Sequence, residues 1–139
     1  MILIDTNVIS EPLRAKPDPH VVEWLDSQSL ETLYLSVITV AELRFGIALL
    51  PVGKRRNQLS EQLETQVMQK FAGRILSFDL SATQAFADLM AKAQASGTII
   101  GMADGYIASI ARVNGMKVAT RDTSPFEAAG IGVINPWID

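Results

Sequence analysis

Four acidic residues lie at positions from which carboxylates of separate chain segments could meet. Each follows an expected strand or lies in the first turn of an expected helix. We refer to these residues as the acidic quartet: Asp5, Glu42, Asp104 and Asp122. Clustered carboxylates repel one another unless a cation lies between them. Oxygen ligands favour Mg²⁺ or Mn²⁺ over zinc or copper, and such sites commonly serve phosphoryl chemistry, in which the metal activates water and neutralises phosphate charge.

Each member of the acidic quartet also has an interpretation that requires no metal. Asp5 could act as the N-cap of a short helix. The segment from Thr39 to Glu42 matches a capping box, in which the Glu42 carboxylate accepts a hydrogen bond from the Thr39 amide. Asp104 and Asp122 could be ordinary acids of a first helical turn and of a loop. The metal site therefore depends on all four residues meeting at one place.

Short apolar segments alternate with amphipathic segments almost throughout the chain. The apolar segments predict strands over residues 1–4, 33–37, 74–78, 116–120 and 131–134. The spacing of apolar residues predicts helices over residues 20–28, 39–50, 57–71, 81–96, 102–113 and 123–129. This alternation predicts a single α/β domain over residues 1–139, with a doubly wound, mainly parallel five-stranded sheet flanked by helices.

Parallel strands end at a common edge of their sheet, where open α/β sheets bind ligands. Asp5 ends the first expected strand, Glu42 lies in the first turn of the helix after the second, and Asp122 follows the fourth. Asp104 joins them if the helix over 102–113 begins at the same edge. The partial positive charge of helix N-termini would help to keep such acids ionised.

The composition bounds the chemistry further. The chain has 139 residues, of which 48% are hydrophobic and 19% charged, as expected for a globular domain. It has no cysteine and one histidine, His20, which excludes disulfides, a cysteine nucleophile and any mechanism that needs two imidazoles. The start of the chain lacks a basic region followed by a long apolar run, so we expect a cytoplasmic protein without a membrane span.

Two arginines could meet a phosphate at the site, and one tryptophan near the end of the chain has a simpler role. Arg14 and Arg121 lie near expected strand ends, where each could meet a phosphate or remain a surface residue. Trp137, near the end of the chain, is expected to pack against the domain rather than stack on bases.

Each acid of the quartet lies in a segment with a recognisable pattern: ILIDTNVIS (2–10), LSVITVAEL (35–43), ADGYIASIA (103–111) and VATRDTSPF (118–126). These four segments resemble the PIN-domain family and, within it, the VapC-type toxins of bacterial toxin–antitoxin pairs. The ending VINPWID (133–139) is similar to the FitB-like branch of that family. The resemblance covers the whole chain. It implies a ribonuclease dependent on Mg²⁺, or alternatively Mn²⁺, on a doubly wound α/β sheet.

The resemblance also implies roles for residues and identities for partners. The acidic quartet matches the family's catalytic, metal-binding carboxylates. Thr120 matches the position of a hydroxyl that supports the site, and Thr6 and Asn7 lie in the family's opening motif. The implied partners are a cognate antitoxin protein, an RNA substrate, operator DNA reached through the antitoxin, and a second copy of the toxin in a homodimer.

Two other functions remain open on the sequence alone. A non-catalytic corepressor would tighten the binding of an antitoxin to operator DNA and would not need the acids. A phosphatase or phosphotransfer domain would use Asp5 as a nucleophile. Such sites usually have a second aspartate at the position of Asn7 and a lysine after the later strand, whereas Lys117 precedes the end of that strand.

Overall fold

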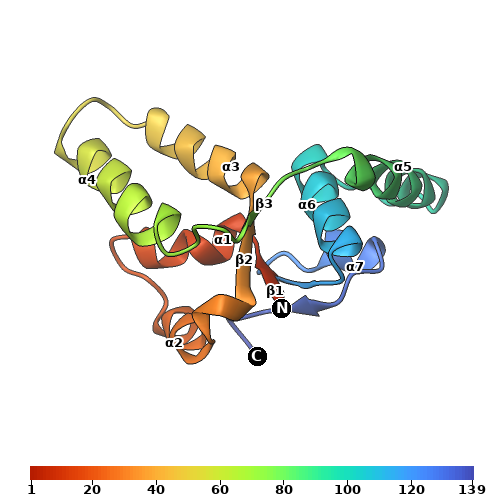
Figure 1. Cartoon of the computed structure of the whole chain (residues 1–139), viewed down its shortest axis with the longest axis horizontal. Coiled ribbons are helices and arrows are strands. Elements are labelled where there is room, and N and C mark those ends of the chain that lie inside the picture. Colours follow the sequence, from red (N-terminus) through yellow and green to blue (C-terminus); the bar gives the residue numbers. More distant parts are fainter.

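A parallel five-stranded sheet forms the centre of the computed structural model, which describes all 139 residues (Figure 1). The strands are β1 (Ile2–Ile4), β2 (Leu33–Ser36), β3 (Ile75–Leu76), β4 (Lys117–Ala119) and β5 (Val133–Ile134). Their order is β3-β2-β1-β4-β5, and all neighbouring pairs are parallel. All five expected strands are present, each shorter than the sequence indicated. The chain winds outward in both directions from a switch point between β1 and β4, where such sheets bind ligands.

Seven α-helices lie between and around the strands. They are α1 (Thr6–Ile9), α2 (Pro19–Ser27), α3 (Val37–Ala48), α4 (Lys54–Gln62), α5 (Leu80–Ala95), α6 (Met102–Val113) and α7 (Ser124–Ala128). Two 3₁₀ turns, η1 (Glu11–Leu13) and η2 (Leu30–Thr32), and a π-helical segment, η3 (Leu63–Met68), complete the chain. The prediction of one helix over 57–71 was only partly right, because α4 continues into the wider turns of η3. Leu63 and Val67 in those turns, and Phe71 just beyond them, all lie in the core.

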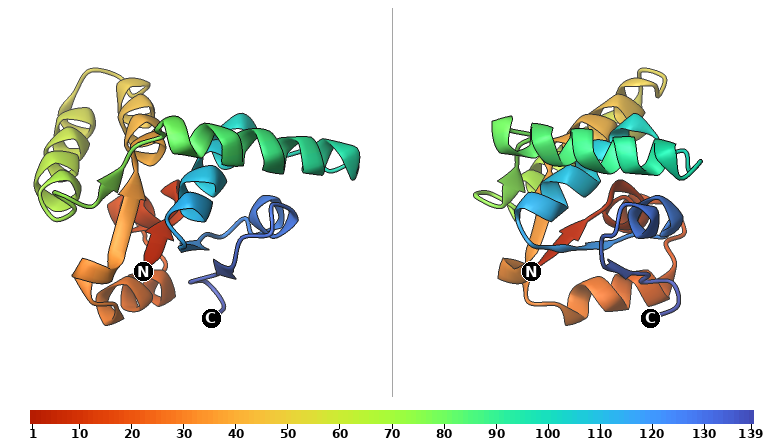
Figure 2. Two further views of the ribbon diagram at one scale, coloured as in Figure 1. Left: turned by 45° about the vertical axis from the view of Figure 1, so that its right-hand side comes forward. Right: turned by 90° about the vertical axis from the view of Figure 1, so that its right-hand side faces the viewer.

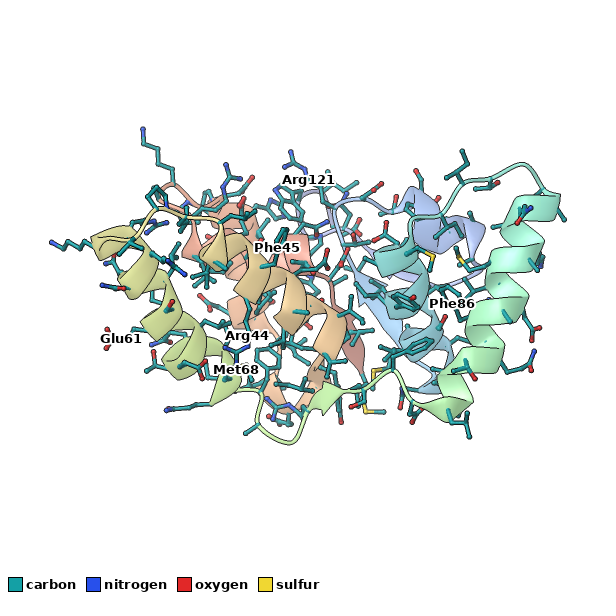
Figure 3. The ribbon with its side chains drawn as sticks, turned by 90° about the horizontal axis from the view of Figure 1, so that it is seen from above. Arg44, Phe45, Glu61, Met68, Phe86 and Arg121 are labelled. Carbon is teal, nitrogen blue, oxygen red and sulfur yellow. The ribbon has the colours of Figure 1, made fainter.

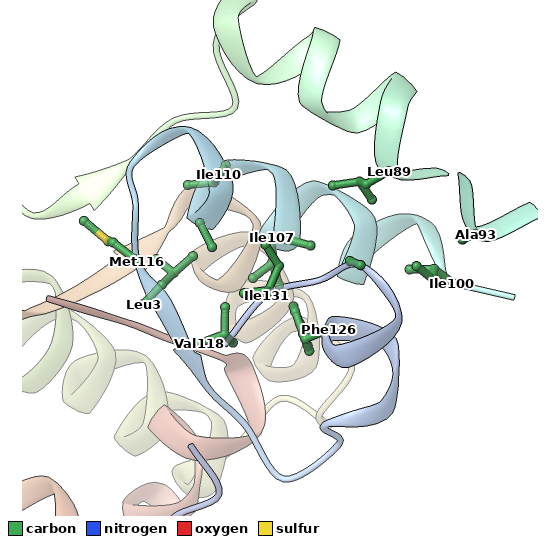
Figure 4. Close-up of a cluster of buried hydrophobic side chains, with 13 residues drawn as sticks. Leu3, Leu89, Ala93, Ile100, Ile107, Ile110, Met116, Val118, Phe126 and Ile131 are labelled. Atoms are coloured by element: carbon green, nitrogen blue, oxygen red, sulfur yellow. The ribbon is translucent and has the colours of Figure 1, made fainter. Parts of the chain in front are cut away.

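The side chains of β1 alternate between two cores, one on each face of the sheet. Leu3 packs with residues of α5, α6 and α7, among them Leu89, Ile107 and Phe126 (Figure 4). Ile4 points to the other face, where the core contains residues of α1, α2, α3 and η3. Figures 1 and 2 show these two groups of helices on either side of the sheet. Burial on both faces explains why the strands are continuous apolar runs rather than alternating ones.

Gly105 allows α6 to pack closely against α5. A Cβ atom at this position would lie 2.8 Å from Met90 Sδ and 3.1 Å from Phe86 Cε2, both on α5. The hydroxyl of Ser109 donates a hydrogen bond of 2.6 Å to the Gly105 carbonyl within α6. The close contact holds the first turns of α6, which carry Asp104, in a fixed place. No helix of the structure is long and apolar enough to span a membrane.

Candidate active site

Asp5 lies at the carboxyl end of β1 and is only 5% exposed. Its Oδ1 atom accepts a hydrogen bond of 2.8 Å from the Thr6 amide, so it is the N-cap of α1. Its Oδ2 atom accepts a hydrogen bond of 2.8 Å from the hydroxyl of Thr120. The capping and site interpretations of Asp5 are therefore compatible, because each uses a different oxygen of one carboxylate.

Thr120 lies directly after β4, is fully buried and organises the loop that carries Asp122. Its hydroxyl oxygen accepts hydrogen bonds from the Asp122 amide at 3.1 Å and from Asn7 Nδ2 at 3.4 Å. Asn7 also accepts a hydrogen bond of 3.2 Å from the Arg121 amide through its Oδ1 atom. These bonds tie the loop after β4 to the start of α1. The three supporting residues expected from the sequence, Thr6, Asn7 and Thr120, thus all contact the acids or the backbone around them.

Glu42 lies in the second turn of α3, not in the first turn as the sequence suggested. The reason is that α3 begins at Val37, with Ser36 as its N-cap; the Ser36 hydroxyl accepts from the Thr39 amide at 3.1 Å. The capping box between Thr39 and Glu42 is therefore wrong. Instead the carboxylate of Glu42 accepts a hydrogen bond of 2.7 Å from the Thr6 hydroxyl, which links α3 to α1.

A pair of buried hydroxyls supports this contact and was not identified from the sequence. Thr39 Oγ1 lies 3.0 Å from Thr6 Oγ1 and 3.4 Å from Ser36 Oγ, and both Thr39 and Ser36 are fully buried. A signal was present, since Ser36 ends an apolar strand segment and immediately precedes a helical pattern. That position suits an N-cap better than Thr39 does.

Asp104 lies in the first turn of α6 and is partly buried. Its carboxyl group accepts no side-chain or capping hydrogen bond, and the N-cap residue of α6 is Gly101. Partial burial is the main reason that the pKa of Asp104 rises from 3.8 to about 6, and repulsion from the other three members of the acidic quartet adds to it. The helix over 102–113 therefore begins at the edge of the sheet where the other acids lie, which meets the condition set above for Asp104 to join them.

The charge on Asp5 is disfavoured by the same causes. Burial raises the pKa of Asp5, and repulsion from Glu42 and Asp122 raises it further. The hydrogen bonds from Thr120 and from the Thr6 amide oppose this rise. Four acids from four segments of the chain are therefore close enough to repel one another, with only hydrogen bonds to offset the repulsion.

The acids do not converge on a single point in this structure. No three acidic or imidazole side chains are arranged closely enough to hold a metal ion as they stand. The chemistry of the donor set nevertheless fits a hard divalent cation, because the groups are all carboxylates and two of them ionise less readily than usual. A cation between them would offset this repulsion, provided that the side chains turn toward it.

The fold and this set of acids place the chain in a known family. Residues 2–131 match the PIN domain family model, so the chain belongs to the PIN-domain family. It is 62% identical over 137 residues to the plasmid stability protein StbB of Pseudomonas syringae pv. tomato, with 99% of each chain covered. It is 61% identical over 137 residues to the VapC ribonuclease Y4jK of Sinorhizobium fredii, covering 99% of this chain and 98% of the relative. It is 55% identical over 139 residues to Toxin FitB of Neisseria gonorrhoeae, with both chains fully covered.

Two solved structures have nearly the same fold. The chain matches the crystal structure of FitAcB from Neisseria gonorrhoeae with a TM-score of 0.96 and 54% identity, and the match covers all of both chains. It matches the structure of FitAB bound to an IR36 DNA fragment with a TM-score of 0.95 and 54% identity, over 99% of this chain and 96% of the other. The single-domain PIN-type α/β fold expected from the sequence is thereby confirmed, as is its five-stranded parallel sheet.

Proposed function

We propose that this protein is the toxin of a toxin–antitoxin pair and acts as a divalent-metal-dependent endoribonuclease. The observation that carries the proposal is the mutual repulsion of the acidic quartet at the switch point of a PIN-domain sheet. A pure binding surface gains nothing from a cluster of acids in which the pKa values of Asp5 and Asp104 are raised, whereas a metal-dependent nuclease needs such a cluster. The relatives named as a VapC ribonuclease and as Toxin FitB support the same assignment.

In this proposal the quartet holds Mg²⁺, with Mn²⁺ as an alternative, Glu42 binding either directly or through water. When bound, the ion supplies an activated water molecule and neutralises charge on the scissile phosphate of RNA. Thr120 fixes the orientation of Asp5 through its 2.8 Å hydrogen bond. Thr6 does the same for Glu42 at 2.7 Å, and Asn7 holds the loop of Asp122 in register with α1. These hydrogen bonds hold Asp5, Glu42 and the loop of Asp122 in place before an ion binds.

We also propose a set of partners. The structures of FitAB and FitAcB support a complex with a cognate antitoxin protein, and the FitAB complex with DNA supports indirect contact with operator DNA. We further infer a homodimer of this chain and an action on cytoplasmic RNA. The DNA-bound relative also favours a second role, in which the toxin acts as a corepressor that tightens the antitoxin on its operator.

The phosphotransfer alternative has less support. Asn7 stands where such sites usually have a second aspartate, and its side chain instead donates to the Thr120 hydroxyl and accepts from the Arg121 amide. Lys117 begins β4, at the opposite end of the strand from Thr120. A lysine at that end does not serve a phosphate bound beside Asp5.

Cleavage of a mixed RNA pool by the antitoxin-free protein tests the ribonuclease function. We expect cutting with Mg²⁺ or Mn²⁺, none with a chelator, and none by Asp104→Asn under any condition. Asp88→Asn is a matched control, because Asp88 is an exposed acid of α5 that contacts Gln84 and lies outside the quartet. Cutting that persists in chelator, or that survives in Asp104→Asn, would overturn the proposal. An intact RNA pool together with antitoxin-dependent DNA binding would favour the corepressor.

A further inference from the structure

Arg121 stands between two residues of the candidate site and has no counter-charge within the chain. It follows Thr120 and precedes Asp122. The two salt bridges of the structure use other arginines, Arg14 with Glu11 and Arg44 with Glu64. Of the seven arginines, only Arg56 and Arg121 have guanidinium groups that donate no hydrogen bond to the chain. An exposed cation thus lies beside an acidic cluster without being neutralised by it.

The Arg121 side chain is nevertheless held in one orientation. Its guanidinium carbon lies 5.0 Å from the ring centroid of Trp137, within the range of a cation–π interaction. Trp137 is itself partly buried against the core that contains Ile4, so the ring is a fixed platform. The Arg121 amide is also tied to Asn7 at 3.2 Å. Backbone and side chain are therefore both ordered before any ligand arrives, which lowers the entropic cost of binding.

RNA binding at this site faces an electrostatic problem that such a cation would ease. The quartet contributes four negative charges when ionised, and one divalent cation offsets only half of that charge. An RNA chain passing over the site would bring further negative phosphates. A planar guanidinium suits a phosphate because it can donate two parallel hydrogen bonds. In Figure 3, which views the molecule from above, Arg121 lies at the upper edge of the molecule.

From this geometry we infer that Arg121, oriented by Trp137, binds a phosphate of single-stranded RNA next to the scissile phosphate. The inference rests on the proposed ribonuclease function and adds a substrate-binding residue to it. Arg121 is a binding residue and Trp137 a positioning residue. The turn at residues 136–138, which carries Trp137, thereby contributes to the site in addition to the packing role expected for Trp137. An acidic side chain of a protein partner is also negatively charged and could bind Arg121. RNA is favoured because its scissile phosphate would lie at the metal-binding acids, which places a neighbouring phosphate close to Arg121.

The test measures the affinity of a fluorescently labelled single-stranded RNA of mixed sequence by anisotropy. Asp104→Asn serves as the parent protein, in Mg²⁺, so that the RNA stays intact. We expect Arg121→Gln to weaken binding about tenfold at low salt, the value of one charge-assisted contact. The slope of log affinity against log salt should fall by about 0.7, as for the loss of one phosphate contact on a single strand. Arg44→Gln removes the same charge from α3 and should change neither quantity.

Variants of Trp137 separate positioning from charge. Trp137→Phe keeps an aromatic face under the guanidinium and should retain the parent affinity. Trp137→Leu should weaken RNA binding about threefold, since cation–π contacts at exposed sites are small. Urea unfolding of each variant confirms that it is folded. In the active protein, Arg121→Gln should raise KM and leave kcat unchanged, as expected for a contact made equally in the ground and transition states.

Several results would overturn the inference. If Arg121→Gln binds RNA like Arg44→Gln while the wild type cuts RNA, the inference fails and the ribonuclease function stands. If the wild type neither binds nor cuts RNA, both fail together. If Arg121→Gln leaves RNA affinity intact but loses the antitoxin, the ligand of Arg121 is a protein carboxylate. Equal affinities of Trp137→Leu and Trp137→Phe would refute the positioning role.

Discussion

Replacing Asp104 with asparagine should stabilise the metal-free protein while abolishing its activity. Asparagine has nearly the shape of aspartate but cannot ionise, so it removes the cost of burying a charge, which is the larger contribution, and also the repulsion from the other three acids of the quartet. The pKa of Asp104 is raised from 3.8 to about 6, which corresponds to a cost of about 3 kcal/mol for ionising this group in the folded protein. Asp104 is only partly buried, and solvent screening reduces the figure. We therefore expect a gain of about 1–2 kcal/mol at pH 7.5.

The gain depends on pH in a defined direction. Because the pKa of Asp104 is higher in the folded protein, the folded state binds more protons than the unfolded state between about pH 4 and 6. The wild type therefore becomes more stable as the pH falls through 6, whereas Asp104→Asn lacks this contribution. The difference in free energy of unfolding between Asp104→Asn and the wild type reaches its full value above about pH 6.5 and should fall to about half of that value by pH 5.

Urea unfolding with a chelator, followed by tryptophan fluorescence at pH 7.5 and pH 5, measures both effects. Asp88→Asn is the control, and it should lie within about 0.5 kcal/mol of the wild type at either pH, because its side chain is exposed on α5. Adding Mg²⁺ should stabilise the wild type and not Asp104→Asn, because an ion that binds only the folded state raises its stability. If Asp104→Asn is no more stable than the wild type at pH 7.5, or gains the same free energy of unfolding at both pH values, ionised Asp104 does not destabilise the folded protein.

Two further predictions concern the residues that support the site. Thr120→Val removes the only side-chain donor to the buried Asp5 Oδ2 atom, so it should destabilise the protein by about 1–3 kcal/mol and slow RNA cleavage. Thr120→Ser should restore the stability and the cleavage rate. An unchanged cleavage rate in the valine variant would contradict the role of the hydroxyl. Gly105→Ala should cost about 1–3 kcal/mol in urea unfolding, because its Cβ would lie 2.8 Å from Met90 Sδ. Gly46→Ala in α3, where nothing lies within 4 Å of the new Cβ, should instead raise the free energy of unfolding by about 0.5–1 kcal/mol. Similar effects at both glycines would argue against close packing of α6 on α5.

The fold could be predicted because its strands are buried on both faces. Leu3 and Ile4 point to opposite cores, so β1 is apolar at both positions, and the same holds for Val118 and Ala119 of β4. Such runs stand out from the amphipathic helices around them. Strand ends were harder to place, because hydrogen-bonded pairing stops before the apolar residues do; the segment expected over 74–78 pairs only through Ile75–Leu76.

The membership of the candidate site could also be predicted, but its internal contacts could not. Asp5 and Asp122 follow strands, so their position at the switch point depends only on the sheet. Glu42 was placed one turn too early, because the spacing of apolar residues puts the start of the helix at Thr39, whereas Ser36 caps it three residues earlier. The hydrogen bond from Thr6 to Glu42 joins residues 36 positions apart and depends on how α1 packs against α3. The contact of Arg121 with Trp137 likewise depends on the return of the C-terminal turn to β4.

Titration with Mn²⁺ measures whether the acidic quartet binds a divalent cation. Electron paramagnetic resonance follows free Mn²⁺ in a titration of the metal-free protein at pH 7.5. We expect saturable binding by the wild type, competition by Mg²⁺, and a loss of at least tenfold in affinity in Asp104→Asn but not in Asp88→Asn. Equal affinity in the wild type and Asp104→Asn, or no saturable binding by the wild type, would show that the quartet does not hold the ion.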